Sequence, residues 1–411
     1  MRAYERLLRY VTYPTASNEA NTSCPSTPEQ LEFGKALVEE MVAMGIADAN
    51  IDGNGYVFGT IPAAKPDAKG PVIGFVAHMD VSADAPCQPV NPRIVEYRGG
   101  DIILSEGIVL SPSEFPVLAQ YKGGGLVVSD GKTLLGCDDK AGIAAILTMA
   151  EYFLANPQVE HGAIKIGFTP DEEIGRGADL FDVERFGADF AYTVDGAAFG
   201  EVEYETFNAS AATVTVTGRS MHPGASKNKM QNASLMAMEL AAMLPAAERP
   251  EHTEGYEGFY HLTSMEGEAE KAVLRYILRD HDADKLRSRE EFLRNAAHYL
   301  NSKYGGGAVT VEIKESYRNM SSVLKDKANW HLIENAYKAV EQVGGTPVSC
   351  PVRGGTDGAR LSFMGLPCPN LGTGSHNHHS RMEFASVQAM DKVAESLVKI
   401  AEIYTDFEIE K

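Results

Sequence analysis

Three short apolar segments constrain the fold of this chain more than any other feature. They read PVIGFVAH, AIKIGFTP and FAYTVDG, and all lie within the first 207 residues. Unbroken apolar runs of this length are typical of strands that a parallel sheet buries on both faces. The segment DKAGIAAILTMAEYFLANP between the first two, and residues 28–45 before them, carry apolar residues at helical spacing. Strand, helix and strand in this order predict an α/β domain with a mostly parallel, covered sheet.

The pattern changes after residue 207. The segments ATVTVTG and VTVEIKES alternate apolar with polar residues, which is typical of an antiparallel sheet with one face in water. Helical stretches at about 233–244 and 284–302 would cover the other face. We therefore expect two domains. The larger is built from residues 1–207 and 320–411, and an α+β domain at 208–319 is inserted into it.

The charge and cysteine content bound the partners and the compartment. A net charge of −20 would repel a phosphate backbone, so we expect no nucleic-acid partner. The chain has no run of about 18 apolar residues, so we expect no membrane span, and its N-terminus lacks the apolar core of a signal sequence. Five cysteines without paired spacing are typical of a reducing compartment, which predicts a cytoplasmic protein.

Polar residues that could carry chemistry stand at the ends of the predicted strands. His78 and Asp80 follow the first strand, and side chains two apart on a strand point the same way. That pattern suits a metal-binding imidazole held by a carboxylate, although a hydrogen-bonded pair at a strand end would look the same. Asp138 and Asp139 precede a helix, where acids also serve as plain caps.

Three acids crowd the end of the second strand. If the segment holding Asp171, Glu172 and Glu173 is extended, Glu172 and Glu173 point to opposite sides, so that one could bind a metal while the other faces a water. A solvated acidic loop is the alternative. Asp195 ends the third strand. Near the C-terminus, GTGSHNHHSRMEF places three histidines within four residues: His376, His378 and His379.

Together these residues indicate one site. Ligands bind at the carboxyl ends of the strands in open α/β sheets, and histidines and carboxylates gather at those ends here. A set dominated by carboxylates suits two divalent ions that share a bridging carboxylate. Zinc is favoured by the imidazoles, and cobalt and manganese are alternatives. The chemistry would be metal-assisted hydrolysis with a free carboxylate as general base.

The order of these motifs resembles a known family. HMD, GCDDKAG, TPDEEIG, TVDG, HPG, RGGTDGA and NHHSRMEF stand as they do in the dizinc aminoacylase/carboxypeptidase-type exopeptidases, over nearly the full chain. EGYEGFYHL and YILRDHD are similar to the branch that cleaves tripeptides. The resemblance implies a zinc-exopeptidase-like fold and an aminopeptidase that releases the N-terminal residue of tripeptides. A dipeptidase, a carboxypeptidase, an N-acyl amino acid deacylase and a non-catalytic homologue remain alternatives.

The resemblance also implies roles for individual residues. It makes Asp139 the ligand that bridges the two zinc ions, and it implies a cis peptide between Asp138 and Asp139. Asp80 would orient a ligand histidine, and Glu172 would be the general base that activates the zinc-bridged water. The remaining metal ligands would be His78, Glu173, Asp195 and His379.

The inserted domain would act as a lid and as the contact of a homodimer. The resemblance implies that His222 stabilises the oxyanion that forms in the reaction. Asn232, Arg279 and Arg353 are candidates for gripping the substrate's terminal carboxylate, since a guanidinium fork matches a carboxylate. Structural ion pairs are the alternative for both arginines. His378 replaces an aromatic residue of the family, and we expect it to lie near the metals without binding them.

Overall fold

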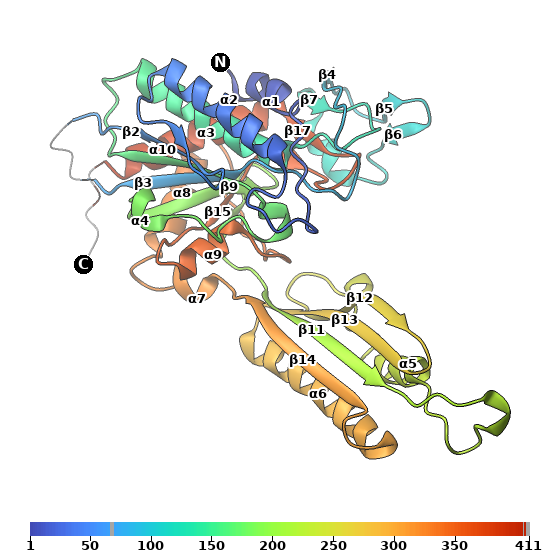
Figure 1. The fold of residues 1–411 in the computed structure, drawn as a ribbon. Helices are drawn as coiled ribbons and strands as arrows, with labels where there is room; N and C mark the ends of the chain where they lie inside the picture. Colours follow the sequence, from blue (N-terminus) through green and yellow to red (C-terminus); the bar gives the residue numbers. More distant parts are fainter. Residues whose placement is uncertain (66–69, 406, 408–411) are drawn as a thin grey trace. The chain divides into compact units, whose positions relative to one another are not determined.

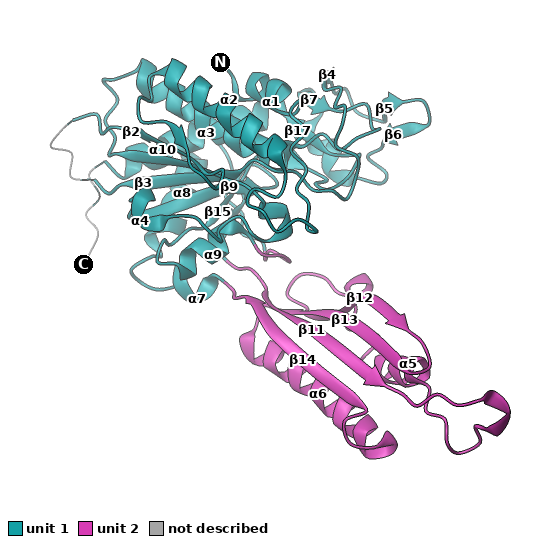
Figure 2. Cartoon of the chain, viewed as in Figure 1, with its two compact units in different colours: residues 1–204, 320–350, 356–411 teal, residues 205–319, 351–355 magenta. Residues whose placement is uncertain are grey.

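The computed structural model describes residues 1–65, 70–405 and 407. Two compact units divide them (Figure 2): unit 1 comprises residues 1–204, 320–350 and 356–411, and unit 2 comprises residues 205–319 and 351–355. The first boundary falls three residues before the predicted one, and a short segment at 351–355 joins unit 2. None of the helices in the described ranges has the length and apolar character that crossing a bilayer requires.

Unit 1 is built around a seven-stranded sheet with the order β1-β2-β8-β3-β9-β15-β10 (Figure 1). Its central strands β8, β3, β9 and β15 run parallel, and β2 and β10 pair antiparallel at the two sides. The strands are β1 (Asn50–Ile51), β2 (Val57–Ile61), β3 (Ile73–His78), β8 (Ile164–Thr169), β9 (Phe190–Gly196), β10 (Val202–Glu203) and β15 (Asn370–Gly372). The predicted mostly parallel sheet is confirmed.

Both faces of this sheet are covered, because alternate residues of β3 enter different cores. Phe75 packs into a large core with residues of several helices, and its neighbour Val76 packs into a second core on the opposite face. The first core uses α1 (Ala3–Tyr10), α2 (Pro28–Met44), α3 (Cys137–Ala155), α8 (His331–Gln342) and α10 (Val387–Ile403). The second uses the short helices α4 (Val183–Phe186) and α9 (Asp357–Phe363), and α7 (Ser321–Leu324) is a further short helix of the unit.

Smaller sheets accompany the main one in unit 1. A four-stranded sheet has the order β16-β17-β7-β4 and a hairpin joins β5 to β6. Their bounds are β4 (Arg93–Glu96), β5 (Ile102–Ser105), β6 (Ile108–Leu110), β7 (Gly125–Val128), β16 (Ser375–His376) and β17 (Phe384–Ser386). His376 therefore ends β16, and His378 and His379 lie in the loop between β16 and β17.

Unit 2 is an antiparallel sheet with helices packed on it. The strand order is β12-β13-β11-β14, with bounds β11 (Asn208–Thr217), β12 (Phe259–Gly267), β13 (Lys271–Asp280) and β14 (Val309–Tyr317). Val214 and Val216 of β11 are buried against α5 (Ala233–Met243) and α6 (Ala283–Tyr304), whereas the threonines that alternate with them are half-buried or exposed. The predicted alternation and both predicted helices are confirmed.

Candidate metal centre

His78 is the common member of the cluster at the sheet's carboxyl edge. It is the last residue of β3, and its ring is buried. Its Nε2 lies 2.9 Å from Oδ1 of Asp138 and 3.3 Å from Oδ1 of Asp195. Its Nδ1 lies 3.0 Å from the carbonyl oxygen of Asp80 and 3.3 Å from that residue's Oδ1. Burial opposes protonation, but the surrounding carboxylates raise the pKa of His78 well above its ordinary value.

Asp138, not Asp139, presents its carboxylate to the histidines. Oδ2 of Asp138 lies 3.3 Å from Nδ1 of His378 and 3.5 Å from Nε2 of His379. Burial would raise the pKa of Asp138, but these imidazoles and His78 hold it well below its usual range.

Asp139 has a different task. Its Oδ2 accepts the backbone N–H of His78 at 3.1 Å, and its Oδ1 accepts that of Gly142 at 3.1 Å. Both oxygens are thus used to hold the chain, and burial followed by the charge of Asp195 raises the pKa of this carboxyl group. This geometry does not support the prediction that Asp139 bridges two metals, because its oxygens accept backbone N–H groups, whereas the carboxylate of Asp138 faces the histidines. The cis peptide between Asp138 and Asp139 is confirmed.

The acidic segment after β8 is a turn rather than the extended chain considered above. Asp171 has φ 59° and begins a 3-10 turn at Glu172–Ile174. Asp80 fixes this turn, because its Oδ1 and Oδ2 accept the backbone N–H groups of Glu172 at 3.0 Å and Glu173 at 3.1 Å. Asp80 thus touches His78 and both glutamates, which suits the orienting role predicted for it.

The two glutamates join different groups despite the turn. Potential ligand atoms of His78, Glu172 and Asp195 lie within 4.8 Å of one another, and so do those of His78, Asp138 and Glu173. Burial, followed by the charge of Asp195, raises the pKa of Glu172 well above its ordinary value. Burial and the charge of Asp138 raise the pKa of Glu173 to about 7.

His379 completes the cluster from the C-terminal loop. Its Nε2 lies 2.8 Å from Oε2 of Glu173, and its Nδ1 lies 3.0 Å from Oδ2 of Asp84. Asp138 and then Glu173 raise the pKa of His379 to about 11, although burial opposes the shift. The other two histidines of the loop differ: Nε2 of His378 pairs with the hydroxyl of Ser375 at 2.7 Å, and His376 pairs with the hydroxyl of Tyr121.

The donor set fits divalent metal ions. Each of the two groups combines an imidazole with carboxylates, as borderline metals such as zinc prefer. Oε1 of Glu173 is buried and, within the described part of the chain, has no hydrogen-bond partner. A buried carboxylate oxygen without a donor is costly unless a cation neutralises it. Asp195 is held for such a role, since its backbone N–H donates to Oδ1 of Asn370 at 3.0 Å.

The residues of unit 2 predicted to bind substrate differ in how far the protein already occupies their polar groups. His222 lies on an exposed loop, where its Nδ1 accepts the backbone N–H of Gly224, and Asn232 caps α5 through the N–H of Leu235. Arg279 donates through Nη1 to the carbonyl oxygen of Arg353 at 3.0 Å, whereas its buried Nε, in the described ranges, lacks a partner.

Arg353 is committed to the protein itself. Its guanidinium donates to the carbonyl oxygens of Gly255 and Glu257 and to the hydroxyl of Thr253, at 2.8–2.9 Å. The structural alternative considered for the arginines thus describes Arg353, with carbonyl and hydroxyl acceptors instead of ion pairs. The grip on a substrate carboxylate predicted for Arg353 is not supported by this geometry.

Sequence reasoning assigned no role to two further acids. Asp84 contacts His379 from the long loop that follows β3, and a long loop with no secondary structure of its own was the signal available for it. Asp357, in the motif RGGTDGA, is buried and accepts the hydroxyl of Thr169 at 2.7 Å. Burial raises the pKa of Asp357 to about 7, with Asp195 and Asp80 adding to it. The motif pointed to this residue, but nothing in the sequence specified its task.

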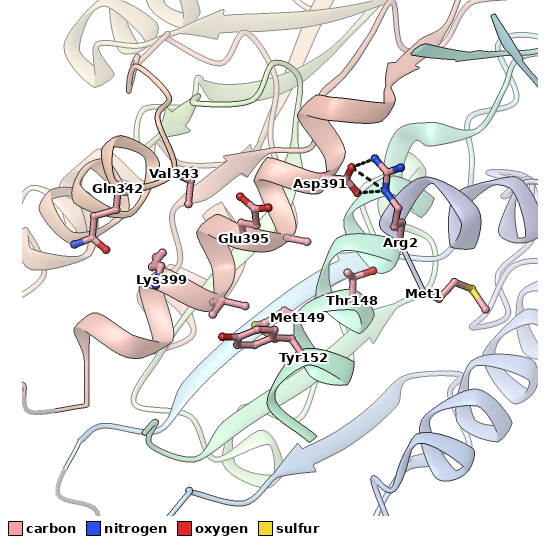
Figure 3. Close-up of a pocket in the computed structure, with 12 residues that line it drawn as sticks. Met1, Arg2, Thr148, Met149, Tyr152, Gln342, Val343, Asp391, Glu395 and Lys399 are labelled. Carbon is pink, nitrogen blue, oxygen red and sulfur yellow. Dashed lines mark hydrogen bonds and ion pairs between the residues drawn. The ribbon is translucent and has the colours of Figure 1, made fainter. Parts of the chain in front are cut away.

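A separate surface pocket of about 490 Å³ lies on unit 1, between the helices α3, α8 and α10 and the N-terminus (Figure 3). Arg2 and Asp391 form an ion pair at its rim, and Tyr152 and Lys399 line it. None of its lining residues belongs to the histidine–carboxylate cluster. The pocket therefore takes no part in the chemistry of that cluster.

Comparison with protein families and curated proteins gives a consistent result. Residues 120–403 match the model of the peptidase family M20/M25/M40. The chain is 51% identical over 406 residues to peptidase T of Halothermothrix orenii, which covers 98% of this chain and 99% of that protein. It is 50% identical over 405 residues to peptidase T of Alkaliphilus oremlandii, with 98% of both chains covered.

Solved structures share the fold at lower identity. An aminopeptidase PepT from Bacillus cereus superposes with a TM-score of 0.75 at 23% identity, covering 98% of this chain and 97% of that one. A tripeptidase from Staphylococcus aureus gives 0.77 at 20% identity and covers 99% and 98%. A dinuclear metal binding peptidase from Bacillus subtilis gives 0.66 at 14% identity and covers 99% and 98%.

Proposed function

The chain belongs to the peptidase family M20/M25/M40, and from this membership we propose that it is a dinuclear metallo-aminopeptidase that releases the N-terminal residue of tripeptides. One observation carries the proposal: two groups of metal-ligand atoms meet at His78 at the carboxyl edge of a parallel sheet. The half-identical relatives called peptidase T support the choice of tripeptides over other substrates of the family.

The proposed ligands divide between two ions. His78 and Asp195 would hold one, Glu173 and His379 would hold the other, and Asp138 would bridge them, because its two oxygens face His78 and His379. The ions are proposed to be zinc, which suits a mixed imidazole and carboxylate set, with cobalt and manganese as substitutes. When bound, they would supply a Lewis acid for the scissile carbonyl and lower the pKa of a water molecule.

The proton transfers fall to Glu172. Its carboxylate lies beside His78 and Asp195, and burial raises its pKa above the ordinary value, which favours uptake of a proton. We assign it to accept a proton from the attacking water and to deliver that proton to the leaving amine. Asp80 positions Glu172 for both steps through the backbone N–H, while its carbonyl and carboxylate fix the ring of His78.

The remaining roles belong to unit 2. His222 is proposed to stabilise the oxyanion, and Arg279, with Asn232, to bind the substrate's terminal carboxylate. The buried, unpartnered Nε of Arg279 supports its part, as far as the described residues go. We further propose a lid function and a homodimer contact for unit 2. A cytoplasmic location is proposed on the five free cysteines.

The experiment compares four substrates on one metal-reconstituted preparation: a free-amine tripeptide, its N-acetyl form, the matching dipeptide and the matching tetrapeptide. We expect the tripeptide to yield its N-terminal amino acid and a dipeptide, at the highest kcat/KM of the four. Preferred cleavage of the N-acetyl form would establish a deacylase, and preferred cleavage of the dipeptide would establish a dipeptidase. Release of the C-terminal residue would establish a carboxypeptidase.

A further inference from the structure

Glu383 is a buried carboxylate that the proposed reaction does not use. It lies just before β17, on the same C-terminal segment as His379, and only 2% of its surface is exposed. A buried carboxylate is retained only where hydrogen-bond donors or cations compensate for the water it has lost. The groups around Glu383 therefore indicate what holds it in place.

Four donors converge on this carboxylate from a single loop. Oε2 accepts the backbone N–H groups of Leu135 at 2.8 Å and Gly136 at 2.6 Å. Oε1 accepts the backbone N–H of Asp138 at 3.1 Å and the thiol of Cys137 at 3.1 Å. All four donors come from consecutive residues that end at the proposed bridging ligand. Such a set of backbone N–H groups around one anion is a strong restraint on the loop.

The restrained loop has no regular structure to define it otherwise. Gly136 is in the left-handed region with φ +79°, and Asp138 and Asp139 have non-helical dihedral angles although α3 is counted from Cys137. Without Glu383, the N–H groups of residues 135, 136 and 138 would lose this shared acceptor. The backbone at Asp138, and with it the orientation of the Asp138 side chain, would then be free to change.

We propose that Glu383 is a positioning residue that fixes the bridging carboxylate of Asp138 relative to the C-terminal ligand His379. It stands four residues after His379 and 245 residues after Asp138, and it is bonded directly to the latter's backbone. It thereby joins the two segments whose side chains must meet at the metals. This inference rests on the proposed metal site, but not on the identity of the substrate.

A purely structural role makes a different prediction. If Glu383 only stabilises a turn, its replacement lowers the stability of the fold and leaves the metal affinity of the folded protein unchanged. If it positions Asp138, the affinity itself falls, because the ligand is no longer held in place before the metal arrives. Partners that orient metal ligands typically change metal affinity by about 10- to 100-fold.

The test compares Glu383→Gln and Glu383→Asp with wild type. Gln keeps the shape but turns an amide N–H₂ toward donor groups, and Asp keeps the charge but is one methylene too short to reach all four donors. Glu40→Gln is the matched control, since Glu40 is a largely buried carboxylate of α2 bonded to Arg6 and Tyr10. Zinc affinity of the chelator-treated, folded proteins is measured by calorimetric titration, with denaturant unfolding in parallel.

We expect zinc to bind about 10- to 100-fold more weakly to Glu383→Gln than to wild type. Glu383→Asp should also bind zinc more weakly than wild type, but by a smaller factor. Glu40→Gln should lose stability at unchanged zinc affinity. Zinc affinities of both Glu383 variants within twofold of wild type would overturn the inference, and so would failure of both to fold. Wild-type protein that binds no zinc, cobalt or manganese would instead remove the proposed metal site, while wild type that binds metal without cleaving tripeptides would remove only the proposed substrate.

Discussion

Asp138 and Asp139 are adjacent acids with opposite expected phenotypes, and replacing each by Asn separates them. Both substitutions replace a carboxyl group by an amide and keep the shape of the side chain. The carboxylate of Asp138 faces three imidazoles, those of His78, His378 and His379. Asp139 instead accepts two buried backbone N–H groups. The first change should therefore affect metal binding and the second the fold.

The magnitudes follow from these contacts. In Asp139→Asn the amide oxygen can keep one N–H group, but the other meets an N–H₂ and is left unsatisfied at a fully buried position. Such a donor costs about 1–3 kcal/mol of unfolding free energy. In Asp138→Asn the amide oxygen can still accept from His78, so no buried backbone donor is left unsatisfied and the metal-free fold loses only the charge pairing with the imidazoles. Its metal affinity should fall by more than the roughly 100-fold that a supporting residue costs, because a ligand is lost.

The assay has two readings for each variant. Metal content after dialysis against a graded chelator series, followed by calorimetric titration with zinc, gives the affinity. Denaturant unfolding of the metal-free protein gives the stability. Tight binding of two zinc ions by Asp138→Asn, together with loss of zinc from Asp139→Asn, would refute the assignment and restore Asp139 as the bridge.

Three further predictions follow from the same contacts. Glu172→Gln should retain metal and lose kcat by about 10²- to 10⁴-fold, the usual contribution of a general base; near-normal kcat by steady-state assay would exclude that role. His379→Ala should lose metal, whereas His378→Ala, whose ring lies 3.3 Å from Asp138 and bonds Ser375, should cost about tenfold or less in kcat/KM; equal losses would make His378 a ligand. The pKa of Asp357 is raised to about 7 in the fold, so the folded protein keeps this carboxyl group protonated where the unfolded chain does not. The unfolding free energy of the metal-free protein should therefore fall as the pH rises from the pKa of the unfolded chain toward 7. Asp357→Asn should remove that loss, which amounts to about 4 kcal/mol at most, and a pH-independent difference between the two unfolding curves would refute the shift.

Periodicity predicted the scaffold because burial on the scaffold is repetitive. The runs that became β3, β8 and β9 are apolar at nearly every position, as strands covered on both faces must be. The alternation in β11 likewise reports one buried and one exposed face. His78, the acids at 171–173 and Asp195 stand at or just after the ends of β3, β8 and β9, so the sheet's carboxyl edge could be predicted as the site before any geometry was known.

The direction of single side chains in the site was not predictable in the same way. The choice between Asp138 and Asp139 depends on backbone dihedral angles of −83° and 106° and of −117° and 32°, which follow neither a helical nor a strand period. The turn at Asp171 is similar, since its φ of 59° is uncommon for any residue except glycine. Both conformations are maintained by contacts with distant residues, among them Asp80 and Glu383, that no local pattern records.

The burial of these acids distinguishes a metal site from the purely structural alternatives considered for them. A helix cap at Asp138 and Asp139 or a solvated loop at Glu172 and Glu173 would leave these acids in water, with ordinary pKa values. Instead the pKa of Asp139, Glu172 and Glu173 is raised, and burial is the largest cause for each. A fold gains nothing by burying like charges unless a cation joins them. The excess of carboxylates over imidazoles here therefore argues that divalent ions belong to the native state, and that removing them should destabilise unit 1 as well as abolish activity.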